Sequence, residues 1–167
     1  MNTRKLTAAA FMTAIGVASA HLIYIPVGVA KCFPVQHAMN LLAAALLGPG
    51  YAVGMAFSIS LLRNLLGLGS LLAFPGSMMG ALLAALLYKR RRSIYTAAAG
   101  ELVGTSIIGA LISYPVAKYL MGREAAMFFF VGPFFFSSAA GVILGYVIFR
   151  AIDRLNLFQE NSFEEGK

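Results

Sequence analysis

Charged residues are scarce in this sequence. They make up 11% of its 167 residues, whereas 60% are hydrophobic and the mean hydropathy is +0.82. Soluble domains carry about 25% charged residues, so a soluble globular protein is excluded. A membrane β-barrel would alternate apolar and polar residues, but runs such as Leu41–Leu47 are continuously apolar. Because only helices and closed barrels satisfy their backbone groups in lipid, we expect an all-α polytopic membrane protein.

The residues and motifs that several kinds of site require are also missing. The one cysteine, Cys32, excludes an internal disulfide and a multi-cysteine metal site. No second histidine or carboxylate lies at metal-ligand spacing from His37, so we expect no metal site and no cofactor. The sequence contains no phosphate-binding loop, no Gly-x-Ser-x-Gly and no His-Glu-x-x-His. We therefore expect neither ATP hydrolysis by this chain nor enzymatic activity.

Basic residues are what the sequence does have, giving a net charge of +7. Four of them, Lys89–Arg92, follow one another between two apolar stretches. Lys and Arg near span ends stay on the cytoplasmic side, so this run predicts an inner loop. Because the basic residues flank apolar stretches, topology and contact with lipid headgroups explain them. We expect the bilayer as a partner, and no nucleic acid.

The apolar pattern predicts a compact bundle of six transmembrane helices, over residues 5–24, 35–47, 51–66, 71–88, 94–119 and 126–150. The second and third are shorter than the roughly 20 residues that a span needs. We keep them apart because Gly48–Gly50 contains a proline between glycines, which breaks helices. Merging them would also place basic residues outside. Both termini are then cytoplasmic, with one transmembrane domain over 1–155 and a polar tail over 156–167.

The first 20 residues resemble a cleaved signal peptide, with a basic start and a small-residue site at Ala18–Ala20. We expect them to be retained, because the apolar stretch continues through Leu22–Tyr24. Small residues also recur every four positions, at Ala10, Ala14 and Ala18. This spacing lays a flat stripe along one helix face, as an interface helix would have.

Polar residues within the predicted spans are candidate site residues, because burying them in lipid is unfavourable. In the predicted topology most of them gather in the outer half of the bundle. This asymmetry predicts a pocket open to the outside, because a channel needs polar residues along its whole length. The candidates for ligand contact are Gln36, His37, Asn40, Arg63, Asn64, Phe74, Ser77, Glu101 and Tyr114.

For some candidates the sequence leaves a structural role open beside the functional one. His37 is interpreted either as a packing histidine or as a ligand contact. Arg63 and Glu101 could form a structural ion pair, since a long Arg side chain nearly spans the expected difference in depth. Asn64 carries no charge to neutralise, so we favour ligand contact for it. We expect Cys32 to be passive.

Three segments of the sequence carry a resemblance to a known family: Ile25–His37, Leu61–Gly67 and Leu72–Met78. Together they resemble ThiW, a substrate-binding (S) component of energy-coupling factor (ECF) vitamin transporters. The resemblance runs from about residue 4 to 150. It implies six helices with both termini inside, in the plasma membrane of a prokaryote, and a substrate site near the outer face.

The same resemblance implies partners and a substrate. S components dock on a transmembrane coupling subunit through small residues of the first helix, which Ala10, Ala14 and Ala18 match. Two cytoplasmic ATPase subunits supply the energy. The substrate associated with ThiW is hydroxyethylthiazole, a precursor of thiamine. It is small and neutral, so it suits a pocket of Phe and Tyr with few hydrogen-bonding groups, and charged contacts from Arg63 and Glu101 are not required.

Other functions stay open at the level of sequence. The chain could bind another small nutrient, such as hydroxymethylpyrimidine or thiamine, and cationic thiamine would favour a carboxylate in the pocket. A stand-alone carrier coupled to an ion would transport without any ATPase subunits. A membrane enzyme would use Glu101 or His37 as a general base, but no motif supports it.

Overall fold

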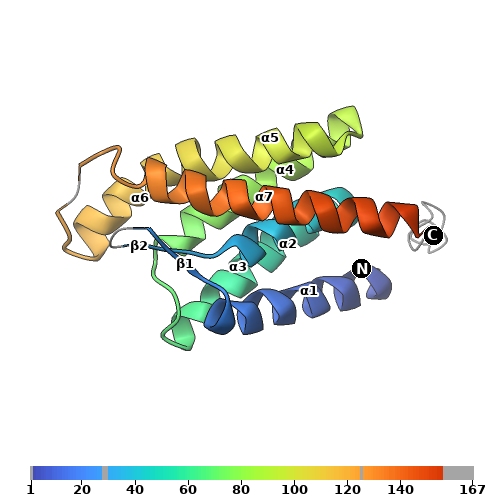
Figure 1. Cartoon of the computed structure of the whole chain (residues 1–167). Helices are drawn as coiled ribbons and strands as arrows, with labels where there is room; N and C mark the ends of the chain where they lie inside the picture. The colour runs from blue at the N-terminus through green and yellow to red at the C-terminus, as the bar shows by residue number, and fades with distance from the viewer. Residues whose placement is uncertain (1, 28–29, 125, 156–167) are drawn as a thin grey trace.

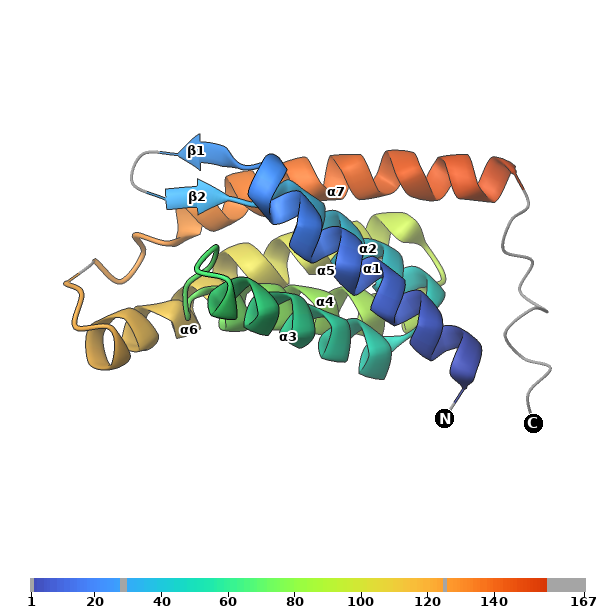
Figure 2. The same cartoon turned by 90° about the horizontal axis from the view of Figure 1, so that it is seen from below.

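A computed structural model describes residues 2–27, 30–124 and 126–155 of the chain. It shows six helical stretches gathered into one bundle (Figures 1 and 2), which confirms the predicted number of helices. The predicted tail, 156–167, lies outside the described residues. The helices are α1 (Thr3–Leu22), α2 (Pro34–Leu46), α3 (Pro49–Leu65), α4 (Ala73–Arg91), a fifth stretch over Ile94–Leu120, and α7 (Val131–Arg154).

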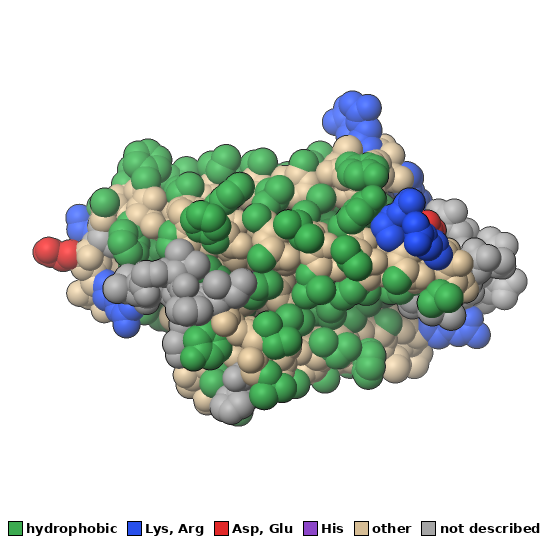
Figure 3. Space-filling view, in the orientation of Figure 1, with side chains coloured by type: hydrophobic (Ala, Val, Ile, Leu, Met, Phe, Trp, Pro, Cys, Tyr) green, Lys and Arg blue, Asp and Glu red, His purple; other side chains and the backbone are tan. Residues whose placement is uncertain are grey.

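Two of the described helical stretches, Ile94–Leu120 and Val131–Arg154, are long and apolar enough to cross a membrane. Large apolar side chains are exposed on several helices, as at Phe11, Tyr95, Ile107 and Ile143. Figure 3 shows hydrophobic side chains across the middle of one face, with Lys and Arg gathered at its ends. This distribution is that of a bundle whose middle faces lipid.

The break between α2 and α3 was predicted correctly. Gly48 has a φ of +90°, in the left-handed region that favours glycine, and Pro49 begins α3. The two helices have 13 and 17 residues, so both are as short as the sequence predicted. Their packing against each other and against α4 makes them a folded-back pair rather than one long helix.

Three local features differ from the sequence-based expectation. The segment between the first two predicted helices, for which the sequence predicted no regular structure, forms an antiparallel hairpin, β1 (Ile25–Val27) paired with β2 (Ala30–Cys32). The last helix begins at Val131, not at 126, and Pro133 falls in its first turn, where a missing N–H is tolerated. The fifth stretch is interrupted, running through α5 (Ile94–Val103), the π-helix η1 (Gly104–Gly109), α6 (Ala110–Pro115) and the π-helix η2 (Val116–Leu120).

Helix α2 forms the centre of the bundle. Eleven of its 13 residues are buried, and it packs against α1, α3, α4, α5 and α7. The first turns of α1 and the last turns of α7 lie at one end of the bundle (Figure 1), together with the Lys89–Arg92 run; we call this the basic end. The hairpin and the start of α7 lie at the opposite end.

Glycines allow the helices around α2 to approach closely. A Cβ on Gly100 would lie 2.8 Å from the Ala84 backbone, and one on Gly104 would lie 2.5 Å from the carbonyl oxygen of Met79. Both contacts hold the fifth stretch against α4. On the other side of the bundle, a Cβ on Gly141 of α7 would lie 2.4 Å from Cβ of His37.

The contact at Gly104 gives a test of this packing. We expect Gly104→Ala to lower the free energy of unfolding by about 1–3 kcal/mol, because its methyl group meets backbone that cannot move aside. Gly54→Ala is the matched control, since a Cβ there meets nothing within 4 Å. Thermal unfolding of both variants in detergent measures the difference. Equal melting temperatures for the two would contradict the close packing of η1 against α4.

Candidate functional site

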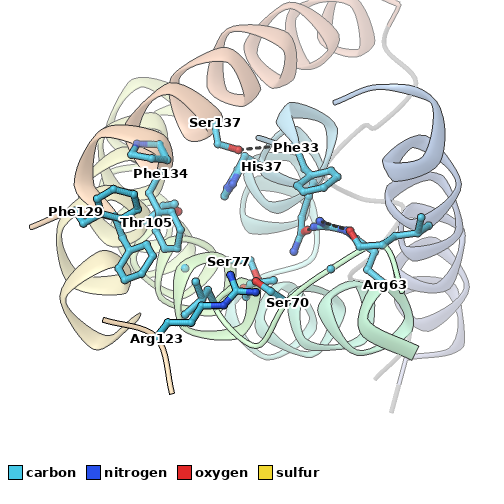
Figure 4. Close-up of a pocket in the computed structure, with 18 of the residues that line it drawn as sticks. Phe33, His37, Arg63, Ser70, Ser77, Thr105, Arg123, Phe129, Phe134 and Ser137 are labelled. Atoms are coloured by element: carbon cyan, nitrogen blue, oxygen red, sulfur yellow. Dashed lines mark hydrogen bonds between the residues drawn. The ribbon is translucent and has the colours of Figure 1, made fainter. Parts of the chain in front are cut away.

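A cavity of about 410 Å³ opens at the end of the bundle opposite the basic end (Figure 4). Its walls come from α2, the turn between α3 and α4, the start of α4, η1 and the start of α7. The residues that line it are Phe33, Gln36, His37, Arg63, Gly67, Leu68, Gly69, Ser70, Leu72, Ala73, Gly76, Ser77, Thr105, Arg123, Phe129, Phe130, Pro133, Phe134 and Ser137.

Four of the nine candidate residues line this cavity, and the structure brings them together from three helices. They are Gln36, His37, Arg63 and Ser77, and each is at least nine-tenths buried. The other five candidates lie outside the lining: Asn40, Asn64, Phe74, Glu101 and Tyr114. Two of these five support the cavity from behind, and the other three have different roles in the fold.

The first support is a hydrogen-bonded group beneath His37. The His37 Nδ1 atom lies 2.8 Å from Oε1 of Glu101, and Asn40 donates through Nδ2 to the same oxygen at 3.1 Å. Asn40 also donates to the carbonyl oxygen of Ser77, and Thr105 donates to Glu101. Glu101 and Asn40 are fully buried. This group therefore joins α2, α4 and α5 and fixes the orientation of the His37 ring.

That orientation leaves the second ring nitrogen of His37 for a ligand. Among the described residues Nε2 has no hydrogen-bond partner, and Figure 4 shows the ring directed towards the cavity. A neutral ring that donates through Nδ1–H presents Nε2 as an acceptor. In that tautomer His37 can accept a hydrogen bond from a hydroxyl group in the cavity.

A second chain of hydrogen bonds starts at Arg63, in the last turn of α3. Its guanidinium donates to Oε1 of Gln36 and, at 3.4 Å, to the carbonyl oxygen of Leu68. Gln36 in turn donates to Ser60, whose hydroxyl lies 2.9 Å from that of Ser77. The guanidinium also lies 3.5 Å from the centre of the Phe33 ring.

The structural ion pair between Arg63 and Glu101, one of the alternatives that the sequence left open, does not form. Glu101 bonds to His37, Asn40 and Thr105, whereas Arg63 bonds to Gln36 and Leu68. The two side chains do not meet because α2 lies between them. Its His37 bonds to Glu101, and its Gln36 bonds to Arg63. Depth along the bundle, which the sequence does give, does not determine which helix faces are adjacent.

Three candidates hold other parts of the structure. Asn64 donates through Nδ2 to the carbonyl oxygens of Ser60 and Ser70, so it fixes the turn that lines one side of the cavity. Phe74 packs on Phe57, with ring centres 5.5 Å apart. The Tyr114 ring lies 5.9 Å from Nζ of Lys118.

The aromatic wall of the cavity was missed by sequence reasoning. Phe129, Phe130 and Phe134 line it beside Phe33. The dense run of phenylalanines over 128–136 was the available signal, but a membrane protein exposes such residues to lipid as readily as to a ligand. Thr105 and Ser137 also line the cavity, on η1 and α7.

The hairpin is attached to α7 beside this wall. The Cys32 thiol donates to the carbonyl oxygen of Pro133, and the Phe33 N–H donates to the Ser137 hydroxyl at 2.9 Å. Burial raises the pKa of the Cys32 thiol, a direction that disfavours the reactive thiolate.

Two comparisons with known proteins both find similarity to transporter proteins. The family model described as "Thiamine-precursor transporter protein (ThiW)" matches residues 6–155. A solved structure of the S component of a bacterial ECF transporter has a similar fold, with a TM-score of 0.78. That similarity covers 93% of this chain and 98% of the other at 17% identity, so it establishes the fold alone. No curated protein sequence matches the chain.

The buried group beneath His37 leads to a test of stability. We expect Glu101→Ala to lower the free energy of unfolding by about 3 kcal/mol, because it leaves buried donors of His37 and Asn40 without their acceptor. Glu101→Gln keeps an acceptor oxygen and should lose less. Glu124→Ala, at an exposed position, is the control and should change little. Denaturant unfolding in mixed micelles measures all three, and equal losses for Glu101→Ala and Glu124→Ala would refute the role of this group.

Proposed function

The chain belongs to the ThiW family of thiamine-precursor transporter proteins, and from that premise we propose that it is the substrate-binding subunit of an ECF-type importer for hydroxyethylthiazole. The observation that carries the proposal is the cavity between α2, α4, η1 and α7. A membrane-embedded transporter component of this fold needs a site for a small molecule, and the cavity has the size and lining for one.

The lining suits a small heterocycle with one hydroxyl arm. A volume of about 410 Å³ falls at the smaller end of the roughly 300–1,000 Å³ typical of ligand sites. Phe33, Phe130 and Phe134 provide aromatic faces for a thiazole ring. The Nε2 atom of His37 can accept a hydrogen bond from the hydroxyl, while Thr105 and Ser137 lie nearby on other walls.

The proposed orientation places the cavity outside the cell. The Lys89–Arg92 run and Arg150 lie towards the basic end, and basic residues near span ends stay in the cytoplasm. In the plasma membrane of a prokaryote both termini would then be cytoplasmic, and the cavity would receive its ligand from outside. This direction is that of uptake.

Partner subunits would supply the energy and the translocation pathway, because the chain has no phosphate-binding loop. Ala10, Ala14 and Ala18 are exposed on α1, whereas Ala9, Gly16 and Ala20 on the same helix are buried. The small-residue stripe therefore faces away from the bundle, where a transmembrane coupling subunit could dock. Two cytoplasmic ATPases would complete the importer.

Binding of hydroxyethylthiazole to the purified protein tests the function. We expect calorimetric titration in detergent to give saturable binding, with hydroxymethylpyrimidine and thiamine much weaker. Phe134→Ala should weaken binding about tenfold, because the ligand loses an aromatic face. Phe136→Ala is the control on the same helix, since that ring is 58% exposed and outside the cavity. Binding of the pyrimidine or of thiamine alone would overturn the substrate assignment.

Docking is tested separately on α1. We expect Ala14→Trp to abolish co-purification with co-expressed coupling and ATPase subunits, because an indole ring keeps the helices apart, and to leave ligand binding unchanged. Ile143→Trp, at an exposed position of α7, is the control and should still co-purify. Retained docking of Ala14→Trp, or uptake in cells that lack the ATPase subunits, would argue for a stand-alone carrier.

A further inference from the structure

We propose that the cavity recognises an anionic group on its ligand, a carboxylate or a phosphate ester on the arm of the heterocycle, held between Arg63 and Arg123. This inference rests on the proposed function and narrows its substrate class. The neutral alcohol would then be the weaker of the compounds that the site accepts.

The charges of the lining are all of one sign. Among the described residues, the side chains of fixed charge that line the cavity are those of Arg63 and Arg123, and no Asp or Glu lines it. Glu101 does not line the cavity; it is fully buried and bonds to His37. A neutral ligand would leave the buried guanidinium group of Arg63 without a counter-charge.

Of the two arginines, Arg63 is the stronger evidence for an anionic ligand, because its side chain is only 2% exposed. Its contacts are neutral: an amide oxygen of Gln36, a carbonyl oxygen of Leu68 and the ring of Phe33. The Nε atom has no hydrogen-bond partner, and the described residues place no carboxylate in salt-bridge contact with the group. A buried charge is unfavourable unless it is paired. An anion in the cavity would supply the missing partner.

The backbone adds positive potential at the same place. Helices α2, α4 and α7 all begin at the cavity, with Phe33, Leu72 and Phe130 as their N-cap residues, and all three residues line it. None of these caps makes a side-chain hydrogen bond. The N-terminal end of a helix carries a partial positive charge that favours anions. The first-turn N–H groups of Gln36, Phe74 and Phe134 already bond to carbonyl oxygens, so these three ends add positive potential rather than hydrogen bonds to a ligand.

Arg123 lies at the rim of the cavity, on the segment that leads to α7. Its side chain is exposed, and Figure 4 shows it reaching towards Ser70 and Ser77. Gly122, at a φ of +60°, and a hydrogen bond from the Arg123 N–H to the carbonyl oxygen of Ala117 hold the backbone there. One guanidinium therefore lies inside the cavity and one at its entrance, an arrangement that can receive an oxyanion from both sides.

Matched ligands test the inference. The probes are hydroxyethylthiazole, the thiazole acetate in which the terminal alcohol is a carboxylate, and the phosphate monoester of the alcohol. We expect the two anions to bind about 10- to 100-fold more tightly than the alcohol, as charge-assisted hydrogen bonds do. Acetate and inorganic phosphate, which lack the ring, should bind far more weakly than either anionic thiazole.

Variants identify the groups responsible. Arg123→Gln should lose most of the preference for the anions, measured as the ratio of their affinities to that of the alcohol, and Arg63→Gln should do the same where it folds. Because Arg123 is exposed, its variant carries the test if Arg63→Gln is unstable. Arg154→Gln removes an exposed charge at the basic end and should keep the full preference.

The outcomes separate this inference from the function on which it rests. Binding of the alcohol as tightly as either anion, or an anion preference unchanged in Arg123→Gln, would overturn the inference and leave the proposed function standing. Equal binding of inorganic phosphate and the phosphate ester would also overturn it. If no thiazole compound binds, both the inference and the substrate assignment fail.

Discussion

The need to satisfy polar groups within an apolar bundle determines where the helices lie. Glu101 is fully buried, so its charge must be met by groups of the protein, and His37 and Asn40 reach it from α2. Asn40 also bonds to the α4 backbone. These contacts join α2, α4 and α5 at one depth and lie beneath the His37 side of the cavity. Other walls of the cavity are lined by phenylalanines.

The same constraint divides the cavity into two chemically distinct sides. On one side Glu101 bonds to His37, Asn40 and Thr105, and His37 and Thr105 of this group line the cavity. On the other side Arg63 is buried among neutral partners, so its charge remains uncompensated. A ligand with a ring, a polar arm and an anionic end would complement the aromatic wall, the histidine and the arginine together. Fold and family establish a transporter component. The contrast between the His37 side and the Arg63 side of the cavity supports a ligand that carries both a ring and an anionic group.

Much of the fold was predictable from the sequence, because it depends on local or one-dimensional signals. The six apolar stretches, the break at Gly48–Gly50 and the close helix packing at glycines follow from length, backbone conformation and side-chain size. The hairpin at Ile25–Cys32 was not predictable in this way, because three-residue strands leave almost no pattern. The late start of α7 was hidden by the apolar character of residues 126–130.

The site was only partly predictable for a different reason. Polarity within a span indicated Gln36, His37, Arg63 and Ser77, and these line the cavity. It indicated Asn64 equally, although that amide bonds to the backbone of a turn, because sequence does not show what a polar group bonds to. The partners of Arg63 and Glu101 depend on which helix lies between them, and that is a property of the packed bundle.

The most direct measurement is an experimental structure of the protein saturated with hydroxyethylthiazole in a lipid environment. The ligand is predicted to lie against Phe33 and Phe134, with its arm between His37 and Arg63. Density for the ligand on a lipid-facing surface or between other helices, with this cavity empty, would contradict the assignment of the site.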